Sequence, residues 1–281
     1  MSDAAERHRQ QIEAWNGPMG AQWAANEART ERSLTPVTEA LLAAAAARPG
    51  ETVLDVGCGC GGSTLAFARA VGPTGRVIGA DVAAPMIEVA RATAAANTEY
   101  LLVDAASHDF PPGTIDLLAS RFGVMFFGDP DAAFARLHRA MKPTGRLAFA
   151  CWRGLAENPW VQVPLAAALT VVPPFPQPGP EDPGPFAFGN PDRVRRILTT
   201  GGFVAPVLEK FDFEMTFPGD PRAAAQGIAT IGPVTRALRE QPEDVRNAAL
   251  DAIAAAVTPH ARDGVVRLGG AVWLVAARAA T

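Results

Sequence analysis

The stretch Val53–Gly62 constrains the fold of this chain more than any other part of its sequence. It reads Val-Leu-Asp-Val-Gly-Cys-Gly-Cys-Gly-Gly, a short apolar run followed at once by a glycine-rich turn. An apolar run with β-branched residues favours a buried strand, and residues 63–70 then read as a helix with hydroxyl side chains near its start. A strand, a glycine turn and a helix N-terminus together let the backbone approach a ligand closely. The stretch therefore predicts a ligand-binding site.

Strand and helix patterns alternate along the chain after this point. The sequence predicts strands at residues 53–56, 76–80, 100–103, 115–120 and 146–152, and helices at 63–70, 86–96 and 130–141. Crossover connections of this kind imply parallel strands and right-handed connections. Strand patterns at 203–217 and 265–277 bring the expected sheet to seven strands. The whole pattern is typical of a doubly wound α/β fold.

Residues 1–33 are expected to form a helical arm ahead of this domain. The pattern predicts two short helices, broken at Gly17-Pro18. Trp15 and Trp23 lie in these helices, and their burial requires the arm to dock on the rest of the chain. The arm either packs on the core or forms a flap over a ligand pocket, with Trp23 and Arg29 facing the pocket.

The remaining residues, 34–281, are expected to form one domain with two additions. A helix at 34–48 opens it. The segment 171–191 is rich in proline, which excludes regular structure, while its phenylalanines argue against a free linker. It is expected to be either a pocket wall or a surface loop. Residues 219–262 are helical and alanine-rich and lie between the last two strands, which predicts a cap over the site.

The composition excludes several classes of protein. Hydrophobic residues make up 48% of the 281 residues, so the chain can bury a large core. The net charge of −4 gives no basic surface, which argues against nucleic acid as a partner. Three cysteines make no disulfide framework, and Cys58 and Cys60 with scattered histidines make no metal site. A polar N-terminus without a long apolar run favours a cytoplasmic protein with no membrane span.

Two acidic residues follow the predicted strands at the edge where the glycine turn lies. Open α/β sheets bind their ligands at the carboxyl ends of the strands. Asp81 ends the strand at 76–80, and Asp104 ends the strand at 100–103. Asp81 is expected to hold the two hydroxyls of a ribose, and Asp104 with Ala105 is expected to contact an adenine. The predicted ligand is therefore a nucleoside.

Two nucleoside cofactors remain possible on these residues. The turn satisfies Gly-x-Gly-x-x-Gly, the dinucleotide fingerprint, and it also satisfies Asp-x-Gly-x-Gly-x-Gly when counted from Asp55. A carboxylate at Asp55 would repel a pyrophosphate and attract a cofactor that carries an amino group. This favours S-adenosylmethionine over a nicotinamide dinucleotide.

On Val53–Gly61, Asp81, Asp104-Ala105 and the two terminal strands, the sequence resembles the class I S-adenosylmethionine-dependent methyltransferases. Within them it looks most like the small-molecule group of the ubiquinone/menaquinone-biosynthesis C-methyltransferases. The resemblance runs from about Trp15 to Trp273 and departs from the family pattern in the helical insertion. It implies a Rossmann-like sheet whose last strand is antiparallel and lies between the fifth and sixth. It also implies S-adenosyl-L-methionine as cofactor and S-adenosyl-L-homocysteine as product.

The resemblance and the strand ends together predict the site residues. Those expected to bind the cofactor are Trp23, Asp55, Gly57, Cys58, Gly59, Asp81, Val82, Met86, Asp104, Ala105, Ser120, Arg121 and Phe122. Methyl transfer is mainly a matter of positioning and desolvation, and it needs a base only when the acceptor must lose a proton. Arg121 and His108 are the candidates for a catalytic role.

The expected function is transfer of a methyl group from S-adenosylmethionine to a small acceptor. The phenylalanines and prolines of the predicted pocket walls favour an apolar or aromatic acceptor. Two alternatives stay open: a protein of the same fold that binds the cofactor without methyl transfer, and a nicotinamide-dependent oxidoreductase. The sequence leaves the acceptor atom and the oligomeric state open.

Overall fold

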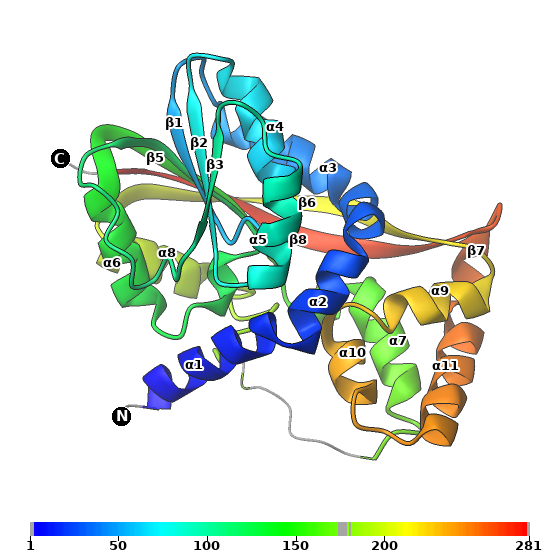
Figure 1. Ribbon diagram of the computed structural model, residues 1–281. Coiled ribbons are helices and arrows are strands. Elements are labelled where there is room, and N and C mark those ends of the chain that lie inside the picture. The colour runs from blue at the N-terminus through cyan, green and yellow to red at the C-terminus, as the bar shows by residue number, and fades with distance from the viewer. Residues whose placement is uncertain (1–2, 174–178, 180, 280–281) are drawn as a thin grey trace.

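A twisted sheet forms the centre of the molecule (Figure 1). The structure is a computed structural model that describes residues 3–173, 179 and 181–279. Its long strands are β1 (Thr52–Val56), β2 (Arg76–Asp81), β3 (Thr98–Leu102), β4 (Ile115–Arg121), β5 (Met141–Trp152), β6 (Phe203–Pro218) and β8 (Val265–Ala279). Over these described ranges the strand order is β3-β2-β1-β4-β5-β8-β6, and the short β7 (Ala261–Arg262) pairs with β8.

The directions of the strands confirm the predicted fold. β1 to β5 pair in parallel with one another, whereas β8 is antiparallel to both of its neighbours, β5 and β6. The structure is therefore the expected doubly wound, Rossmann-like α/β sheet, with its last strand antiparallel between the fifth and sixth. The strand order reverses between β1 and β4, and a crevice for ligands opens at such a point beyond the carboxyl ends of the strands.

Helices cover both faces of the sheet because its parallel strands are apolar on both sides. Leu41 and Phe67 are buried against one face, and Phe134 and Ile197 are buried against the other. The helices that carry these residues, together with the one beside β3, are α3 (Glu27–Ala45), α4 (Gly62–Val71), α5 (Ala84–Ala92), α6 (Pro130–Ala140) and α8 (Pro191–Thr200).

The N-terminal arm consists of α1 (Asp3–Asn16) and α2 (Pro18–Ala25), separated at Gly17 as predicted. Figure 1 shows both helices lying across one end of the sheet. The expected boundary at residue 33 falls inside α3, which begins at Glu27 and continues through Pro36. An interior proline removes one helical hydrogen bond, but tertiary contacts hold this helix, among them a 2.8 Å hydrogen bond from Ser33 Oγ to the carbonyl oxygen of Thr216.

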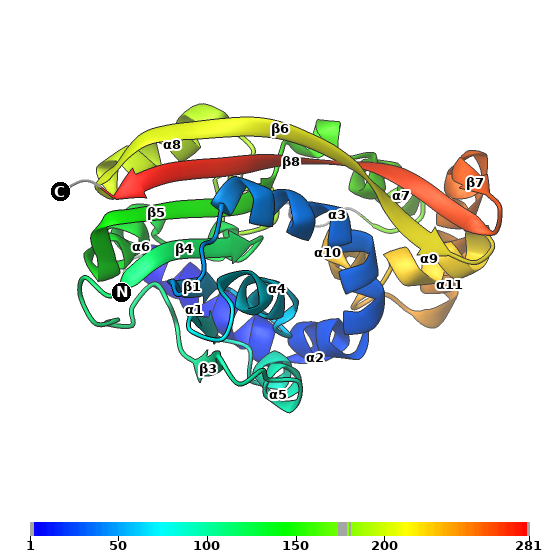
Figure 2. The same ribbon diagram turned by 90° about the horizontal axis from the view of Figure 1, so that it is seen from above.

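The insertion between β6 and β8 is helical, as predicted. It contains α9 (Pro221–Ile228), α10 (Gly232–Leu238), α11 (Glu243–Val257) and the 3-10 turn η3 (Thr258–His260). Figures 1 and 2 show these helices gathered beyond one end of the sheet, beneath the extended β6 and β8. Among the described residues, no helix is both long and apolar enough to cross a membrane.

One helix escaped the sequence analysis. α7 (Pro159–Ala168) follows the 3-10 turn η2 (Leu155–Glu157) and packs against α10 and α11. Its sequence is almost uniformly apolar and contains Pro164, so it shows neither a helical period nor an uninterrupted helix pattern. Of the proline-rich segment, Phe175 lies outside the described residues, and the described part has no regular helix or strand before α8.

Candidate functional site

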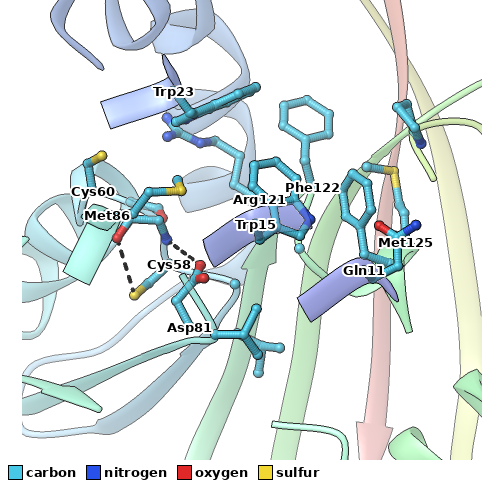
Figure 3. A pocket seen from close by; sticks show the side chains of 18 of the residues that line it. Gln11, Trp15, Trp23, Cys58, Cys60, Asp81, Met86, Arg121, Phe122 and Met125 are labelled. Carbon is cyan, nitrogen blue, oxygen red and sulfur yellow. Dashed lines mark hydrogen bonds between the residues drawn. The ribbon is translucent and has the colours of Figure 1, made fainter. Parts of the chain in front are cut away.

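A pocket lies at the carboxyl ends of β1 to β5. Figure 3 shows side chains of α1 and α2 facing it, and residues of α3 and the first residue of α10 also line it. Its lining falls into three groups. The nucleoside end contains His8, Asp81, Val82, Met86, Asp104 and Ala105. The loop end contains Gly57, Cys58, Gly59, Cys60, Ser63, Glu31 and Arg121. The aromatic end contains Phe122, Met125, Trp152, Trp160, Met215 and Ile231.

Asp81 ties the second strand to the glycine turn. Its Oδ2 accepts a hydrogen bond of 2.8 Å from the amide of Gly59, and its Oδ1 accepts one of 2.9 Å from the amide of Ala83. Burial raises the pKa of Asp81, although the backbone amides act in the opposite direction. Each carboxylate oxygen has a further lone pair, so the carboxylate is fixed and retains acceptors for two hydroxyl groups.

Asp104 is held from both sides at the neighbouring strand. Its Oδ1 accepts from the amide of Ala106 at 2.9 Å, and its Oδ2 lies 2.7 Å from Ser107 Oγ and 2.8 Å from His8 Nε2. Burial raises the pKa of Asp104, but the hydrogen bonds from His8 and Ser107 outweigh it, so the pKa is lowered overall. The same hydrogen bond raises the pKa of His8 against the effect of burial.

The N-terminal arm forms a wall of the pocket. Asn16 Nδ2 donates to the carbonyl oxygen of Val82 at 2.8 Å, and the amide of Ala84 donates to Asn16 Oδ1 at 3.1 Å. Trp15 packs edge-on against Trp23 at a centroid distance of 5.9 Å, and both indoles line the pocket. The arm thus both packs on the core and faces the pocket through Trp23. Arg29, also expected to face the pocket, lies outside its lining and donates to Asn26 Oδ1 and Thr230 Oγ1.

We expect His8→Ala to loosen α1 from the pocket. The substitution removes a hydrogen bond between the arm and Asp104, so S-adenosylhomocysteine should bind about 3- to 10-fold more weakly by calorimetry. The folded pKa of His8 is raised, so the stability from this pair is fully present below the unfolded pKa and declines as the pH rises through the folded value. The difference in unfolding free energy between wild type and variant should therefore shrink from pH 6 to pH 9.

His260→Ala, in η3 of the insertion, is the control for this substitution because His260 lies outside the pocket lining. Equal affinity of His8→Ala and wild type would contradict the role of α1 in the pocket.

The glycine turn has a backbone that side chains would block. Gly57, Gly59 and Gly61 have φ values of 67°, 55° and 89°. A Cβ atom on Gly57 would lie 2.5 Å from the Cα of Gly123, so the loops after β1 and β4 touch backbone to backbone.

The two cysteines of the turn carry neutral thiols. Burial raises the pKa of Cys58, and burial together with the charges of Glu27 and Glu31 raises the pKa of Cys60 to about 12. Both thiols therefore stay neutral, as side chains that fill the loop.

Two of the predicted residues lie behind the pocket wall. Asp55 is fully buried, and its Oδ2 accepts from Ser63 Oγ and Thr64 Oγ1, each at 2.7 Å. Ser120 Oγ accepts from the amides of Gly123 and Val124 at 3.1 and 3.3 Å. The structure brings neither side chain into the lining. Both fix the loops that do line the pocket.

His108 also lies away from the pocket lining. Its amide donates to the carbonyl oxygen of Asp104 at 2.8 Å, which folds the loop back after β3. Its ring then packs edge-on against Phe110 at a centroid distance of 4.6 Å. The structure gives this histidine no place beside a ligand, in contrast to the catalytic role expected of it.

Arg121, in contrast, lines the pocket with an acidic partner that the sequence analysis missed. Arg121 Nη1 donates to Glu31 Oε2 at 2.8 Å and to Thr38 Oγ1 at 2.7 Å, and Arg121 Nη2 also pairs with Glu31 Oε1. The arginine side chain is 8% exposed and the glutamate side chain 25%. Glu31 is ninety positions away in the sequence, so no local signal could have revealed the pair.

Three aromatic rings in mutual contact, one pair of them stacked, form the far end of the pocket. The rings of Phe122 and Trp152 lie 4.5 Å apart with an interplanar angle of 9°, and Trp160 lies 4.8 Å from Trp152. Phe122 has a φ of 68°, a conformation that costs a non-glycine residue roughly 1–3 kcal/mol. Trp152 and Trp160 were not predicted as site residues. The only available signal was the position of Trp152 at the end of the fifth predicted strand.

The three groups together fit S-adenosylmethionine. Asp81 and Asp104 offer acceptors at two successive strand ends, where a ribose and an adenine would lie. The glycine turn has no side chains in the way, and the lining there carries Glu31 and Arg121, groups of opposite charge. A pyrophosphate at the glycine turn would lie against the carboxylate of Glu31, which disfavours a dinucleotide.

Comparison with known proteins agrees with this fit. A family model for a methyltransferase domain matches residues 53–145. The chain is 32% identical over 198 residues to nocamycin O-methyltransferase from Saccharothrix syringae, which covers 65% of this chain and 70% of that protein. It is 39% identical over 105 residues to the ubiquinone/menaquinone biosynthesis C-methyltransferase of Teredinibacter turnerae, which covers 36% of this chain and 42% of that protein.

Solved structures share the fold. Phosphoethanolamine N-methyltransferase 2 of Haemonchus contortus, in complex with S-adenosyl-L-methionine, superposes with a TM-score of 0.54 at 18% identity, over 88% of this chain and 53% of that one. The [4+2]-cyclase SpnF superposes with a TM-score of 0.52 at 19% identity, over 88% of this chain and 81% of that one. The sequence comparisons, the order of the strands and the lining of the pocket lead to the same conclusion. The chain belongs to the family of S-adenosylmethionine-dependent methyltransferases.

Proposed function

We propose that this methyltransferase acts on a small acceptor with a flat and largely apolar body. The observation that carries the proposal is the aromatic end of the pocket, where Phe122 stacks on Trp152 and the ring of Trp160 packs beside Trp152 at an angle of 42°. Met125 and Met215 complete this end with flexible thioethers. Pockets built in this way bind ligands by apolar contact and ring stacking.

The arrangement of the chain supports catalysis by positioning and desolvation. Bound S-adenosylmethionine would supply an electrophilic methyl group. The chain would hold the nucleoside through Asp81 and Asp104 and hold the acceptor against the rings. The arm, with Trp15 and Trp23, would exclude water. None of the six residues of the aromatic end titrates near neutral pH, so an acceptor that must lose a proton, such as a phenol, would enter as its anion or give the proton to water.

A second candidate is a cofactor-binding protein of the same fold that does not transfer the methyl group. The likeness to a [4+2]-cyclase motivates it, since it shows that this fold also serves another reaction. A nicotinamide oxidoreductase is a third candidate. Glu31 beside the glycine turn disfavours it, because its carboxylate would repel a pyrophosphate.

Binding and turnover distinguish these candidates. In calorimetry, S-adenosylhomocysteine should bind with a Kd of about 1–100 μM and NAD should produce no heat of binding at the same concentrations. With S-adenosylmethionine present, a panel of flat phenols and naphthols should release S-adenosylhomocysteine, whereas aliphatic alcohols of equal size should not. Binding without release from any acceptor would favour the second candidate. Binding of NAD alone would contradict the proposal.

A further inference from the structure

The order of the strands determines where each part of an extended nucleoside ligand lies. Asp104 follows β3, Asp81 ends β2, the glycine turn follows β1, and Arg121 ends β4. These strands lie next to one another in the order β3-β2-β1-β4. This inference rests on the proposed function, in which the adenine lies at Asp104 and the ribose at Asp81. The part of the cofactor beyond the ribose then lies over β1 and β4, at the loop end of the pocket.

The part beyond the ribose is an amino acid, with one ammonium and one carboxylate group. Asp55 was the first candidate for the ammonium, but it is fully buried beneath the turn and does not line the pocket. At the loop end, the charged side chains of the lining are Glu31 and Arg121. Figure 3 shows Arg121 extending from the end of β4 toward Trp23 on α2.

The Glu31–Arg121 pair lies directly against the turn. A Cβ atom on Gly62, the first residue of α4, would come within 2.2 Å of Glu31 Oε2. In the described structure the hydrogen bonds of Arg121 use three of its five N–H donors. Each oxygen of Glu31 accepts from Arg121 and retains a lone pair. The pair therefore has an acceptor and donors to spare, side by side, at the pocket wall.

We propose that Glu31 and Arg121 bind the amino-acid end of the cofactor, Glu31 through the ammonium group and Arg121 through the carboxylate. A zwitterionic ligand group is complementary to a preformed ion pair, because each charge then gains a second partner. The pair is fixed by Thr38 and by the bidentate geometry, so little ordering is needed on binding. The first turns of α3 thus belong to the cofactor site.

Four ligands test this assignment by calorimetry: S-adenosylhomocysteine, its analogue without the amino group, its analogue without the carboxylate, and 5′-methylthioadenosine, which lacks both. Wild type should bind each single-deletion analogue about 10- to 100-fold more weakly than S-adenosylhomocysteine. In Glu31→Gln, the loss caused by removing the amino group should fall to less than threefold, while the loss for the carboxylate remains. Arg121→Met should show the reverse pattern.

The affinity for 5′-methylthioadenosine should change by less than about threefold in both variants, because that ligand has no amino-acid end. Glu51→Gln is the matched control, since Glu51 and Arg146 form a similar bidentate pair, with both hydrogen bonds at 2.7 Å, outside the pocket. It should retain the wild-type pattern for all four ligands.

Unchanged discrimination in Glu31→Gln would overturn the assignment, as would a loss of affinity that is equal for all four ligands. Should Glu31→Gln fail to fold, the wild-type titrations still test the proposal, because equal affinity of the wild-type protein for all four ligands would overturn it. Failure of wild type to bind S-adenosylhomocysteine at all would instead contradict the proposed function, so the two failures are distinguishable.

Discussion

Asp81→Ala should reduce the affinity for S-adenosylhomocysteine by about 100-fold or more. The carboxylate offers acceptors for two ribose hydroxyls, and hydrogen bonds to a charged group contribute about 1.5–3 kcal/mol each. The substitution also leaves the amides of Gly59 and Ala83 without their present acceptor, which loosens the turn. Calorimetric titration of the purified variant measures the effect directly.

Asp116→Ala is the matched control for this substitution. Asp116 also accepts from a backbone amide, that of Thr52 at 2.9 Å, and from Lys142 Nζ, but it does not line the pocket. Its loss should lower the melting temperature and leave the affinity for S-adenosylhomocysteine within about threefold of wild type. Unchanged affinity in Asp81→Ala would show that this carboxylate does not hold the ribose.

The sequence analysis predicted the sheet well because its signals are local. The apolar runs of β1 to β5 are bounded by glycine, proline or an acidic residue, and crossover connections allow few topologies. Helices whose sequences contain an interior proline were missed or given the wrong bounds. α7 was missed because Pro164 interrupts a uniformly apolar stretch. α3 was expected to begin at residue 34, but it begins at Glu27 and continues through Pro36.

The site was predictable only where it follows the strand ends. Asp81, Asp104 and the glycine turn line the pocket as expected, since parallel strands present their carboxyl ends at one edge. The partners that complete the site come from distant segments. His8 reaches Asp104 across 96 positions and Glu31 reaches Arg121 across 90. No periodicity or spacing encodes such pairs, because they arise from the docking of α1 and α3 on the finished sheet.

Asp55→Asn should stabilise the protein at neutral pH. Burial raises the pKa of Asp55 from 3.8 to about 6, although hydrogen bonds from Thr64 and Ser63 and the charge of Arg121 oppose it. The folded state therefore binds a proton more tightly than the unfolded state, so ionisation of Asp55 costs about 3 kcal/mol of stability at pH 7. Below about pH 3 the carboxyl is protonated in both states and the cost is absent.

Urea unfolding of wild type and Asp55→Asn at intervals from pH 4 to pH 7.5 measures this cost. The variant should gain stability relative to wild type by about 2.5 kcal/mol as the pH rises over this range, because the uncharged amide can still accept from Ser63 or Thr64 through its oxygen. Thr64→Val should act in the opposite direction, since it removes a 2.7 Å hydrogen bond to the ionised carboxylate.

The same Asp55→Asn variant decides whether this side chain acts on the ligand or on the loop. Asp55 lies beneath the turn and outside the lining, so its loss should weaken binding of S-adenosylhomocysteine far less than Asp81→Ala does. A pH-independent difference in stability would contradict the buried charge, and a 100-fold loss of affinity would show that the carboxylate reaches the ammonium group after all. A stabilised variant with nearly intact affinity means that the charge at Asp55 is retained at a cost to the fold and does not bind the ammonium group, which is the role we propose for Glu31.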